Sequence, residues 1–239
     1  MKDAVLVTGG SRGIGRAVIE RLVEDGYDII NLDLQAPEAP FDNEQHFEVD
    51  VSDESQLKAV LSEVLAQRTV TRLVNNAGIV RPAFIEDTEL ADMHAVMGVN
   101  LGASIICAQM LLPHMKEAGF GRIVNISSRA ALGKTKRIAY ASSKAGLHGF
   151  TKALALEVGR HGVTVNAVGP GPIATELFHR VNPPGAPATQ RILETIPMGR
   201  VGTPADVAHQ VASFLDVRAG FITGQVVYVC GGMTVGLAS

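Results

Sequence analysis

The fold is decided by the stretch Thr8-Gly9-Gly10-Ser11-Arg12-Gly13-Ile14-Gly15. It follows an apolar run from Ala4 to Thr8, which we expect to form a strand, and precedes a helical pattern over Arg16 to Glu24. Glycines at such a junction permit a tight turn, let backbone N–H groups approach a pyrophosphate, and allow close helix packing. The N-terminus of the helix adds a partial positive charge. The stretch therefore predicts a dinucleotide-binding turn, whereas the lack of a GxxxxGK(S/T) pattern disfavours a phosphoryl-transfer P-loop.

Beyond this turn, short β-branched runs alternate with helix-sized segments. Several of the runs are apolar almost throughout, which is typical of strands covered on both faces. Further strands are expected over Asp28 to Leu32, His46 to Val49, Arg72 to Asn75, Arg122 to Ser127, Thr164 to Val168 and Gln225 to Val229, with helices that include Glu54 to Gln67 and Leu90 to Met115. The rhythm predicts an α/β fold: a single doubly wound Rossmann-type domain over residues 1–239, with a seven-stranded parallel sheet flanked by helices.

One stretch, residues 174–203, shows neither pattern and contains the turn-rich run Asn182-Pro183-Pro184-Gly185-Ala186-Pro187. Long irregular segments inside compact domains are uncommon and often serve as lids or binding loops. We interpret it as a substrate lid, with a tolerated surface excursion as the alternative.

Composition narrows the class of protein. The net charge is −3 without long runs of either sign, so neither nucleic acid nor an anionic membrane is expected as the main partner. The two cysteines, Cys107 and Cys230, lack CxxC spacing and a histidine cluster, which predicts neither a disulfide scaffold nor a metal site. The first expected strand begins by Ala4, and no apolar stretch looks long enough to span a bilayer. A cytoplasmic protein is expected.

The choice between NAD and NADP depends on two residues. Asp33 stands at the end of the second expected strand, where a carboxylate accepts hydrogen bonds from the adenine ribose of NAD and repels a 2′-phosphate. Arg12 argues the other way, because a guanidinium near that ribose can hold a phosphate. In this geometry Asp33 is closer to the 2′ position of the ribose, where the two cofactors differ. The sequence therefore favours NAD, with NADP as the alternative.

Tyr140 and Lys144 form the candidate reaction centre, near the start of an expected helix. A spacing of four puts both side chains on one helix face, with Cβ atoms about 5–6 Å apart. At an effective dielectric constant of about 20, one cation at that range contributes about 3–4 kcal/mol. That is enough to lower the phenol pKa from about 10 by about two units. We therefore expect Tyr140 to act as a general acid or base near neutral pH.

Two serines, Ser127 and Ser128, end the expected strand that begins at Arg122. A hydroxyl at the carboxyl end of a strand can polarise a substrate carbonyl or steady an alkoxide. Because side chains alternate along a strand, the two serines face opposite sides and only one can serve. Strand register favours Ser128.

Together these features resemble the short-chain dehydrogenase/reductase family over nearly the whole chain. Thr8, Gly9, Gly13 and Gly15 match its TGxxxGxG turn, the run Asn75-Asn76-Ala77-Gly78 matches its NNAG motif, and Tyr140 with Lys144 matches YxxxK. The run from Val168 to Thr175 is similar to its PG motif beside the nicotinamide. In one departure, the separation from Ser128 to Tyr140 is about one residue shorter than the family's usual value. Ser127 would restore that count, so both serines stay open.

The resemblance implies roles for many residues. Asn100 would hold a water that connects Lys144 to solvent, Ser128 would orient the substrate, Tyr140 would be the acid/base, and Lys144 would also bind the nicotinamide ribose. The adenine would contact Asp50 and Val51, the ribose Asn76, and the carboxamide Ile173 and Thr175. The full set of implied cofactor contacts is Gly9, Ser11, Arg12, Gly13, Ile14, Gly15, Asp33, Asp50, Val51, Asn76, Ala77, Gly78, Tyr140, Lys144, Pro170, Gly171, Ile173 and Thr175. A homotetramer is also implied.

Three functions follow as hypotheses. The first is an NAD(H)-dependent oxidoreductase that interconverts a secondary alcohol and a ketone by hydride transfer. The alternatives are an NADPH-dependent 3-oxoacyl-thioester (acyl carrier protein) reductase and a catalytically inactive, cofactor-sensing relative. Arg129, Lys134, Lys136 and Arg137 lie between the serines and Tyr140 without an acid among them. They form either a cationic rim for a carboxylate, a phosphate or an acidic carrier protein, or a solvated or interface loop.

Overall fold

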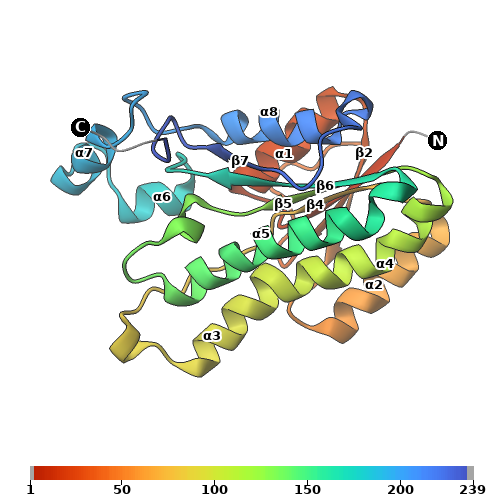
Figure 1. Cartoon of the computed structure of the whole chain (residues 1–239), viewed down its shortest axis with the longest axis horizontal. Coiled ribbons are helices and arrows are strands. Elements are labelled where there is room, and N and C mark those ends of the chain that lie inside the picture. The colour runs from red at the N-terminus through yellow and green to blue at the C-terminus, as the bar shows by residue number, and fades with distance from the viewer. Residues whose placement is uncertain (1–2, 236–239) are drawn as a thin grey trace.

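A seven-stranded parallel sheet forms the middle layer of the computed structural model, which describes residues 3–235 (Figure 1). The strand order is β3-β2-β1-β4-β5-β6-β7. The strands are β1 (Ala4–Thr8), β2 (Asp28–Asp33), β3 (Glu44–Glu48), β4 (Arg72–Asn75), β5 (Gly121–Ile126), β6 (Val163–Pro170) and β7 (Val226–Val229). The predicted doubly wound Rossmann-type fold is confirmed. The order reverses between β1 and β4, the place where such sheets bind ligands at the carboxyl ends of their strands.

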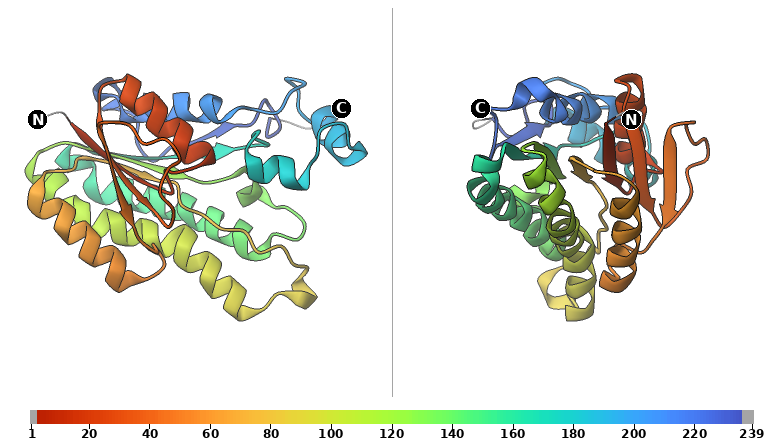
Figure 2. Two further views of the ribbon diagram at one scale, coloured as in Figure 1. Left: turned by 180° about the vertical axis from the view of Figure 1, so that it is seen from behind. Right: turned by 90° about the vertical axis from the view of Figure 1, so that its right-hand side faces the viewer.

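Helices cover both faces of the sheet (Figure 2). One face carries α1 (Gly13–Glu24) and α8 (Pro204–Leu215), whose buried residues include Ile19 and Val211. The other face carries α2 (Glu54–Gln67), α4 (Ala103–Glu117) and α5 (Ile138–Val158), with Leu57, Leu61 and Leu111 among its fully buried residues. The sheet therefore separates two apolar cores, which explains the nearly continuous apolar strands.

One helix contradicts an expectation from the sequence. The helix α3 (Leu90–Met97) continues through a π-helical turn, η2 (Gly98–Gly102), into α4. The run Leu90–Glu117 has 28 residues and a mean hydropathy of 1.8, so by length and composition alone it could cross a membrane. The prediction that no stretch is long enough was therefore wrong. In this fold the helix is a core element, because Cys107, Leu111 and Met115 are fully buried on it.

Several helices and strands begin or end at other residues than predicted. The differences arise where side chains outside an element help to decide its boundary. The strand β3 begins at Glu44, before the apolar residues, and ends at Glu48. The helix α1 begins within the glycine turn, at Gly13. The stretch 174–203, expected to be irregular, contains α6 (Glu176–Val181) and α7 (Pro187–Glu194). Thr175 caps α6 by accepting a hydrogen bond from the Phe178 N–H, and Pro187 begins α7, both common helix starts.

Truncation of a buried leucine tests the core beneath α4. We expect Leu111→Ala to lower the free energy of unfolding by about 2–5 kcal/mol, because it removes packed methyl groups and leaves a cavity. Leu132, whose exposed fraction is 62%, provides the matched control, and Leu132→Ala should cost less than about 0.5 kcal/mol. Urea unfolding at one protein concentration measures both changes. Equal losses would contradict this packing.

Candidate active site

The glycine turn between β1 and α1 is packed backbone against backbone. Gly9 and Gly13 have φ angles of 66° and 58°, in the left-handed region that favours glycine. A Cβ atom on Gly15 would overlap the carbonyl oxygen of Gly9. The turn therefore has no room for a side chain at Gly9 or Gly15, and its backbone packs directly against the start of α1 and the segment after β4.

A buried polar network supports this turn from below. The Asn31 side chain accepts a hydrogen bond from the Gly10 N–H (3.1 Å) and donates to Ser11 Oγ (3.1 Å) and Glu44 Oε1 (2.8 Å). Arg16 Nη1 donates to both Glu44 carboxylate oxygens, at 2.9 and 2.8 Å. Ser11 is thus a buried supporting residue, although it was expected among the cofactor contacts. The sequence analysis missed this network; its one signal was a polar Asn31 inside the otherwise apolar run of β2.

The segment after β4 braces the turn from the other side. Asn76 Nδ2 donates to the carbonyl oxygens of Gly9 (2.7 Å) and Thr8 (3.1 Å). Thr8 Oγ1 accepts hydrogen bonds from the N–H groups of Asn76 and Ala77, each 3.0 Å long. Asn76 therefore fixes the relative position of two loops and also borders the space between them.

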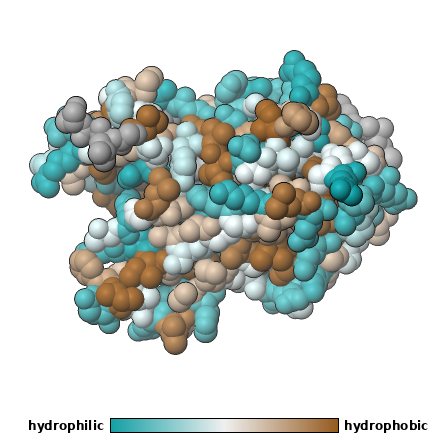
Figure 3. Space-filling model, in the orientation of Figure 1, coloured by the Kyte–Doolittle hydropathy of each residue, from teal (hydrophilic) through white to brown (hydrophobic). Residues whose placement is uncertain are grey.

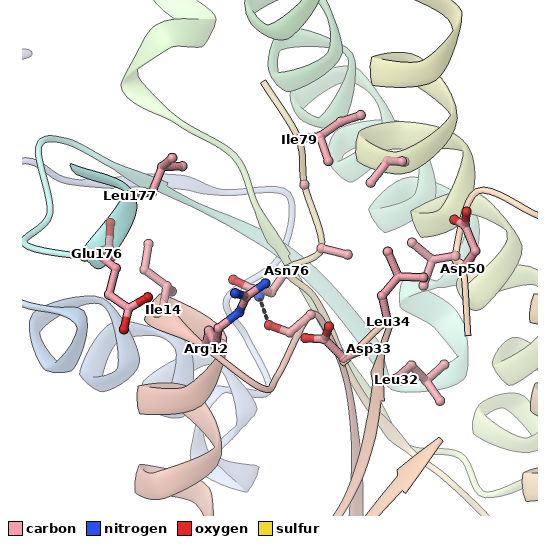
Figure 4. Close-up of a pocket in the computed structure, with 18 of the residues that line it drawn as sticks. Arg12, Ile14, Leu32, Asp33, Leu34, Asp50, Asn76, Ile79, Glu176 and Leu177 are labelled. Atoms are coloured by element: carbon pink, nitrogen blue, oxygen red, sulfur yellow. Dashed lines mark hydrogen bonds between the residues drawn. The ribbon is translucent and has the colours of Figure 1, made fainter. Parts of the chain in front are cut away.

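That space is a cavity of about 490 Å³ (Figure 4). Its walls come from the carboxyl ends of several strands and from α6, and Glu176 and Leu177 lie across it from Asp50. Of the expected cofactor contacts it is lined by Gly9, Arg12, Gly13, Ile14, Gly15, Asp33, Asp50, Val51, Asn76, Ala77, Gly78 and Thr175. The lining residues missed from the sequence are Leu32, Leu34, Val49, Ile79, Val99, Glu176, Leu177 and Arg180. Most of these residues are apolar, and nothing in the sequence marks them as cavity residues apart from their position near strand ends.

A dinucleotide fits these residues. Gly9, Gly13 and Gly15 line the cavity without side chains, which suits a pyrophosphate, and the apolar lining suits an adenine ring. Asp33 is half-buried at the cavity, and its two carboxylate oxygens accept hydrogen bonds from the N–H groups of Ser11 (3.0 Å) and Gln35 (3.1 Å). Arg12 lines the same cavity and is exposed.

The residues of the expected PG motif lie near the start of the lid stretch. Pro170 ends β6, and a Cβ atom on Gly171 would come within 2.8 Å of the Cys230 Cα atom. Ile173 is buried and forms a bridge with Gly202. Of this group only Thr175 lines the cavity. The close approach of Gly171 to Cys230 fixes where the chain leaves the sheet toward α6.

The two serines after β5 point in different directions. Ser127 is buried, donates to the Lys144 carbonyl oxygen (2.9 Å), and contacts His148 Nε2 (2.8 Å). Ser128 Oγ accepts a hydrogen bond from the Ala130 N–H (3.1 Å), and this side chain contributes to lowering the pKa of the Tyr140 hydroxyl. The structure therefore brings Ser128, and not Ser127, to the phenol.

Lys144 is buried beneath Tyr140. Its Nζ atom donates to the Ile126 carbonyl oxygen (2.7 Å) and lies 5.7 Å from the centre of the Tyr140 ring. Burial lowers the pKa of Lys144 to about 8, because desolvation disfavours the ammonium. A Cβ atom on Gly78 would lie 3.4 Å from both Lys144 Nζ and Asn100 Oδ1. Gly78 lines the cavity, so the lysine sits directly behind its wall.

Asn100 is held within the π-helical turn η2. Its Oδ1 atom accepts from the Ile79 N–H (2.8 Å), while Nδ2 donates to the Ile79 carbonyl (3.1 Å) and to Ser143 Oγ (3.0 Å). The side chain therefore ties the segment after β4 to α5.

The expected shift of the Tyr140 pKa is wrong for this structure. Burial raises the pKa of the phenol, while hydrogen bonding to Ser128 and the charge of Arg137 lower it to a smaller extent. The charge of Lys144 does not dominate the pKa of Tyr140, because the ammonium is turned toward the Ile126 carbonyl and is itself disfavoured by burial. The phenol is thus protonated at neutral pH.

Known proteins are similar to this chain over most of their length. A family model described as enoyl-(acyl carrier protein) reductase matches residues 9–234. The chain is 35% identical over 237 residues to a (2S)-[(R)-hydroxy(phenyl)methyl]succinyl-CoA dehydrogenase subunit of Thauera aromatica, covering 95% of this chain and 94% of the relative. It is also 35% identical over 245 residues to a 3-oxoacyl-(acyl-carrier-protein) reductase of Staphylococcus aureus, covering 98% of each. A solved structure titled "ElxO with NADP Bound" superposes with a TM-score of 0.88 at 30% identity, covering 98% of this chain and 99% of that one.

Replacement of one glycine tests the turn. We expect Gly15→Ala to weaken binding of NADH or NADPH by at least about tenfold, because the added Cβ atom overlaps Gly9 and pushes α1 from the turn. Gly159 is the matched control: it has a right-handed φ of −56°, and the Cβ atom that alanine adds would meet no atom of residues 3–235 within 4 Å, so Gly159→Ala should leave binding within about twofold. Nucleotide fluorescence titration measures both. Unchanged binding by Gly15→Ala would exclude this turn as the cofactor site.

Proposed function

The chain belongs to the short-chain dehydrogenase/reductase family of oxidoreductases, and from that premise we propose that it interconverts a secondary alcohol and a ketone with NAD(H). The observation that carries the proposal is the grouping of Ser128, Tyr140 and Lys144 at the end of β5, with Lys144 behind the cavity wall at Gly78. Proton transfer and dinucleotide binding thus meet at one edge of the sheet.

The chain's own residues have distinct tasks in ketone reduction. Ser128 donates a hydrogen bond that orients the substrate carbonyl, and the protonated Tyr140 gives its proton to the carbonyl oxygen. The bound nicotinamide supplies the hydride. The buried Lys144 ammonium then steadies the phenolate, and with a pKa of about 8 it can return a proton near neutral pH. Asn100 holds the loop containing Ile79 against α5, so that these groups keep their positions.

The lid over residues 174–203 is part of the proposal. Four of its residues, Thr175, Glu176, Leu177 and Arg180, line the cavity at one side (Figure 4). A segment that contributes a wall of the cofactor cavity can cover the bound ligand and exclude water.

NAD is the proposed cofactor because of Asp33. The backbone N–H groups of Ser11 and Gln35 hold its carboxylate at the cavity, where it can accept from a ribose and repel a 2′-phosphate. The second candidate is an NADPH-dependent 3-oxoacyl-thioester reductase. The exposed Arg12 at the same cavity favours it, as does the similarity to the Staphylococcus aureus enzyme and to the NADP-bound structure.

A catalytically inactive, cofactor-sensing protein is disfavoured, because Asn100, Ser128, Tyr140 and Lys144 are all present and grouped. The homotetramer and the cytoplasmic location stay predictions.

Removal of one hydroxyl tests the chemistry. We expect Tyr140→Phe to bind NADH within about twofold of the wild-type affinity but to lose at least about a thousandfold in turnover, because the general acid is gone. The assay follows NADH absorbance with a panel of ketones, sugars and 3-oxoacyl thioesters, and the alcohols in reverse. The proposed function would be refuted if the wild type converted no compound in the panel, or if Tyr140→Phe kept full activity.

Cofactor preference is tested at Asp33. We expect the wild type to bind NADH at least about tenfold more tightly than NADPH, and Asp33→Ala to lose most of that difference, because the carboxylate both accepts from the ribose and repels the phosphate. Arg12→Gln should weaken only NADPH binding. Equal or tighter NADPH binding by the wild type would instead support the reductase alternative.

A further inference from the structure

The loop that joins β5 to α5 carries cations that the proposed chemistry does not use. Residues 129–137 contain two arginines and two lysines but no acid. In Figure 1 this loop projects between α6 and α3, beyond the end of the sheet. The space-filling view shows the molecule hollowed on that side (Figure 3). The loop therefore borders the approach to the reaction centre.

Three of these side chains, Arg129, Lys134 and Arg137, form what we term the cationic cluster. All three belong to one nine-residue loop, and the charges of Arg137 and Arg129 add to burial in lowering the pKa of Lys134. Arg129 and Arg137 are half-buried, whereas Lys134 is exposed. Like charges held together in a partly desolvated place repel, and this cost is relieved when an anion lies between them.

Within residues 3–235, no carboxylate lies within 4.0 Å of any cation of this cluster. The nearby Arg81 differs, because it pairs with Asp92 at 3.6 Å. The cluster therefore presents charge that the described part of the chain leaves unneutralised.

The loop is held in a fixed shape. Lys136 has a φ of 60°, the one left-handed residue other than glycine among residues 3–235, and a conformation that costs energy for a residue with a Cβ atom. Its Nζ atom lies 4.5 Å from the centre of the Phe84 ring, and Ala83 forms a bridge with Arg137. These contacts fasten the loop to the segment that follows β4.

The cluster adjoins the reacting atoms. Arg129 follows Ser128 directly, and Arg137 precedes Tyr140 by less than one helical turn. The charge of Arg137 reaches the Tyr140 hydroxyl, since it contributes to lowering the pKa of that group. One substrate molecule can therefore place an anionic group at this cluster and a carbonyl group at Ser128 and Tyr140, provided that only a few bonds separate the two groups.

We propose that Arg129, Lys134 and Arg137 bind an anionic group, a carboxylate or a phosphate, carried by the substrate. The guanidinium forks of two arginines match either group with paired hydrogen bonds, and the lysine adds a point charge. The proposal rests on the proposed function, because it places the reacting carbonyl at Ser128 and Tyr140. It narrows the substrate class to anionic carbonyl compounds and their alcohols.

The test measures anion binding without turnover. The full chain is saturated with whichever of NADH and NADPH it binds, then titrated by calorimetry with succinate and, separately, with inorganic phosphate. We expect the wild type to bind at least one anion, and Arg129→Gln/Lys134→Gln to bind it at least about tenfold more weakly. The matched control, Lys116→Gln/Arg160→Gln, removes two positive charges from exposed positions, in the last turn of α4 and just after the end of α5, and should stay within about twofold. Arg129→Lys keeps the charge but loses the guanidinium fork, so its affinity should lie between that of the wild type and that of Arg129→Gln.

Kinetics then identify the source of the anion. Levulinate is compared with its methyl ester, and dihydroxyacetone phosphate with dihydroxyacetone, because the members of each pair share one reacting carbonyl. The anionic member of one pair should have a kcat/KM at least about tenfold higher, a preference that Arg129→Gln/Lys134→Gln loses. The proposal is overturned if the wild type binds neither anion, or if both double variants weaken binding equally. Since the titration needs no turnover, failure of the Tyr140 chemistry would leave its result standing.

Discussion

The hydrogen bond from Lys144 Nζ to the Ile126 carbonyl oxygen, 2.7 Å long, joins α5 to the carboxyl end of β5. An ammonium with so little exposure is costly, and it is tolerated only with a well-placed acceptor. The bond sets the distance and rotation of α5 relative to the strand. Tyr140, one turn earlier on the helix, then meets Ser128, two residues beyond Ile126. Because side chains alternate at the end of the strand, Ser127 points away from the phenol and contacts Lys144 and His148 instead.

The same strand edge holds the dinucleotide cavity because the sheet changes direction between β1 and β4. The loop after β4 connects the two halves. Asn76 on that loop holds the glycine turn, while Gly78 and Ile79 contact the surroundings of Lys144 and Asn100. Three consecutive peptide units thus separate the contact with the glycine turn from the contact with Asn100. The close packing of this loop against the glycine turn leaves no room for a Cβ atom at Gly9 or Gly15.

The sequence predicted those parts of the molecule that depend on local pattern. Alternating apolar runs predicted the sheet, and spacing predicted the glycine turn and the placement of Tyr140 and Lys144 on one helix face. Ser128 was favoured by strand register, against the spacing that pointed to Ser127. The Asn31–Glu44–Arg16 network could not be found, because a polar residue in a strand does not reveal its partners. The sign of the Tyr140 pKa shift was missed for a related reason, since it depends on burial. Likewise α6 and α7 were hidden by prolines and glycines that here mark helix starts and turns.

The central claim is that this edge of the sheet brings a hydride and the Tyr140 proton to one carbonyl group. The most direct measurement uses NADH carrying deuterium at the transferable position of C4, with the ketone that the protein reduces fastest. Mass spectrometry of the product should find one deuterium on the carbinol carbon, and no labelled product with Tyr140→Phe. A carbinol carbon without deuterium, or equal labelling by the variant, would contradict the account.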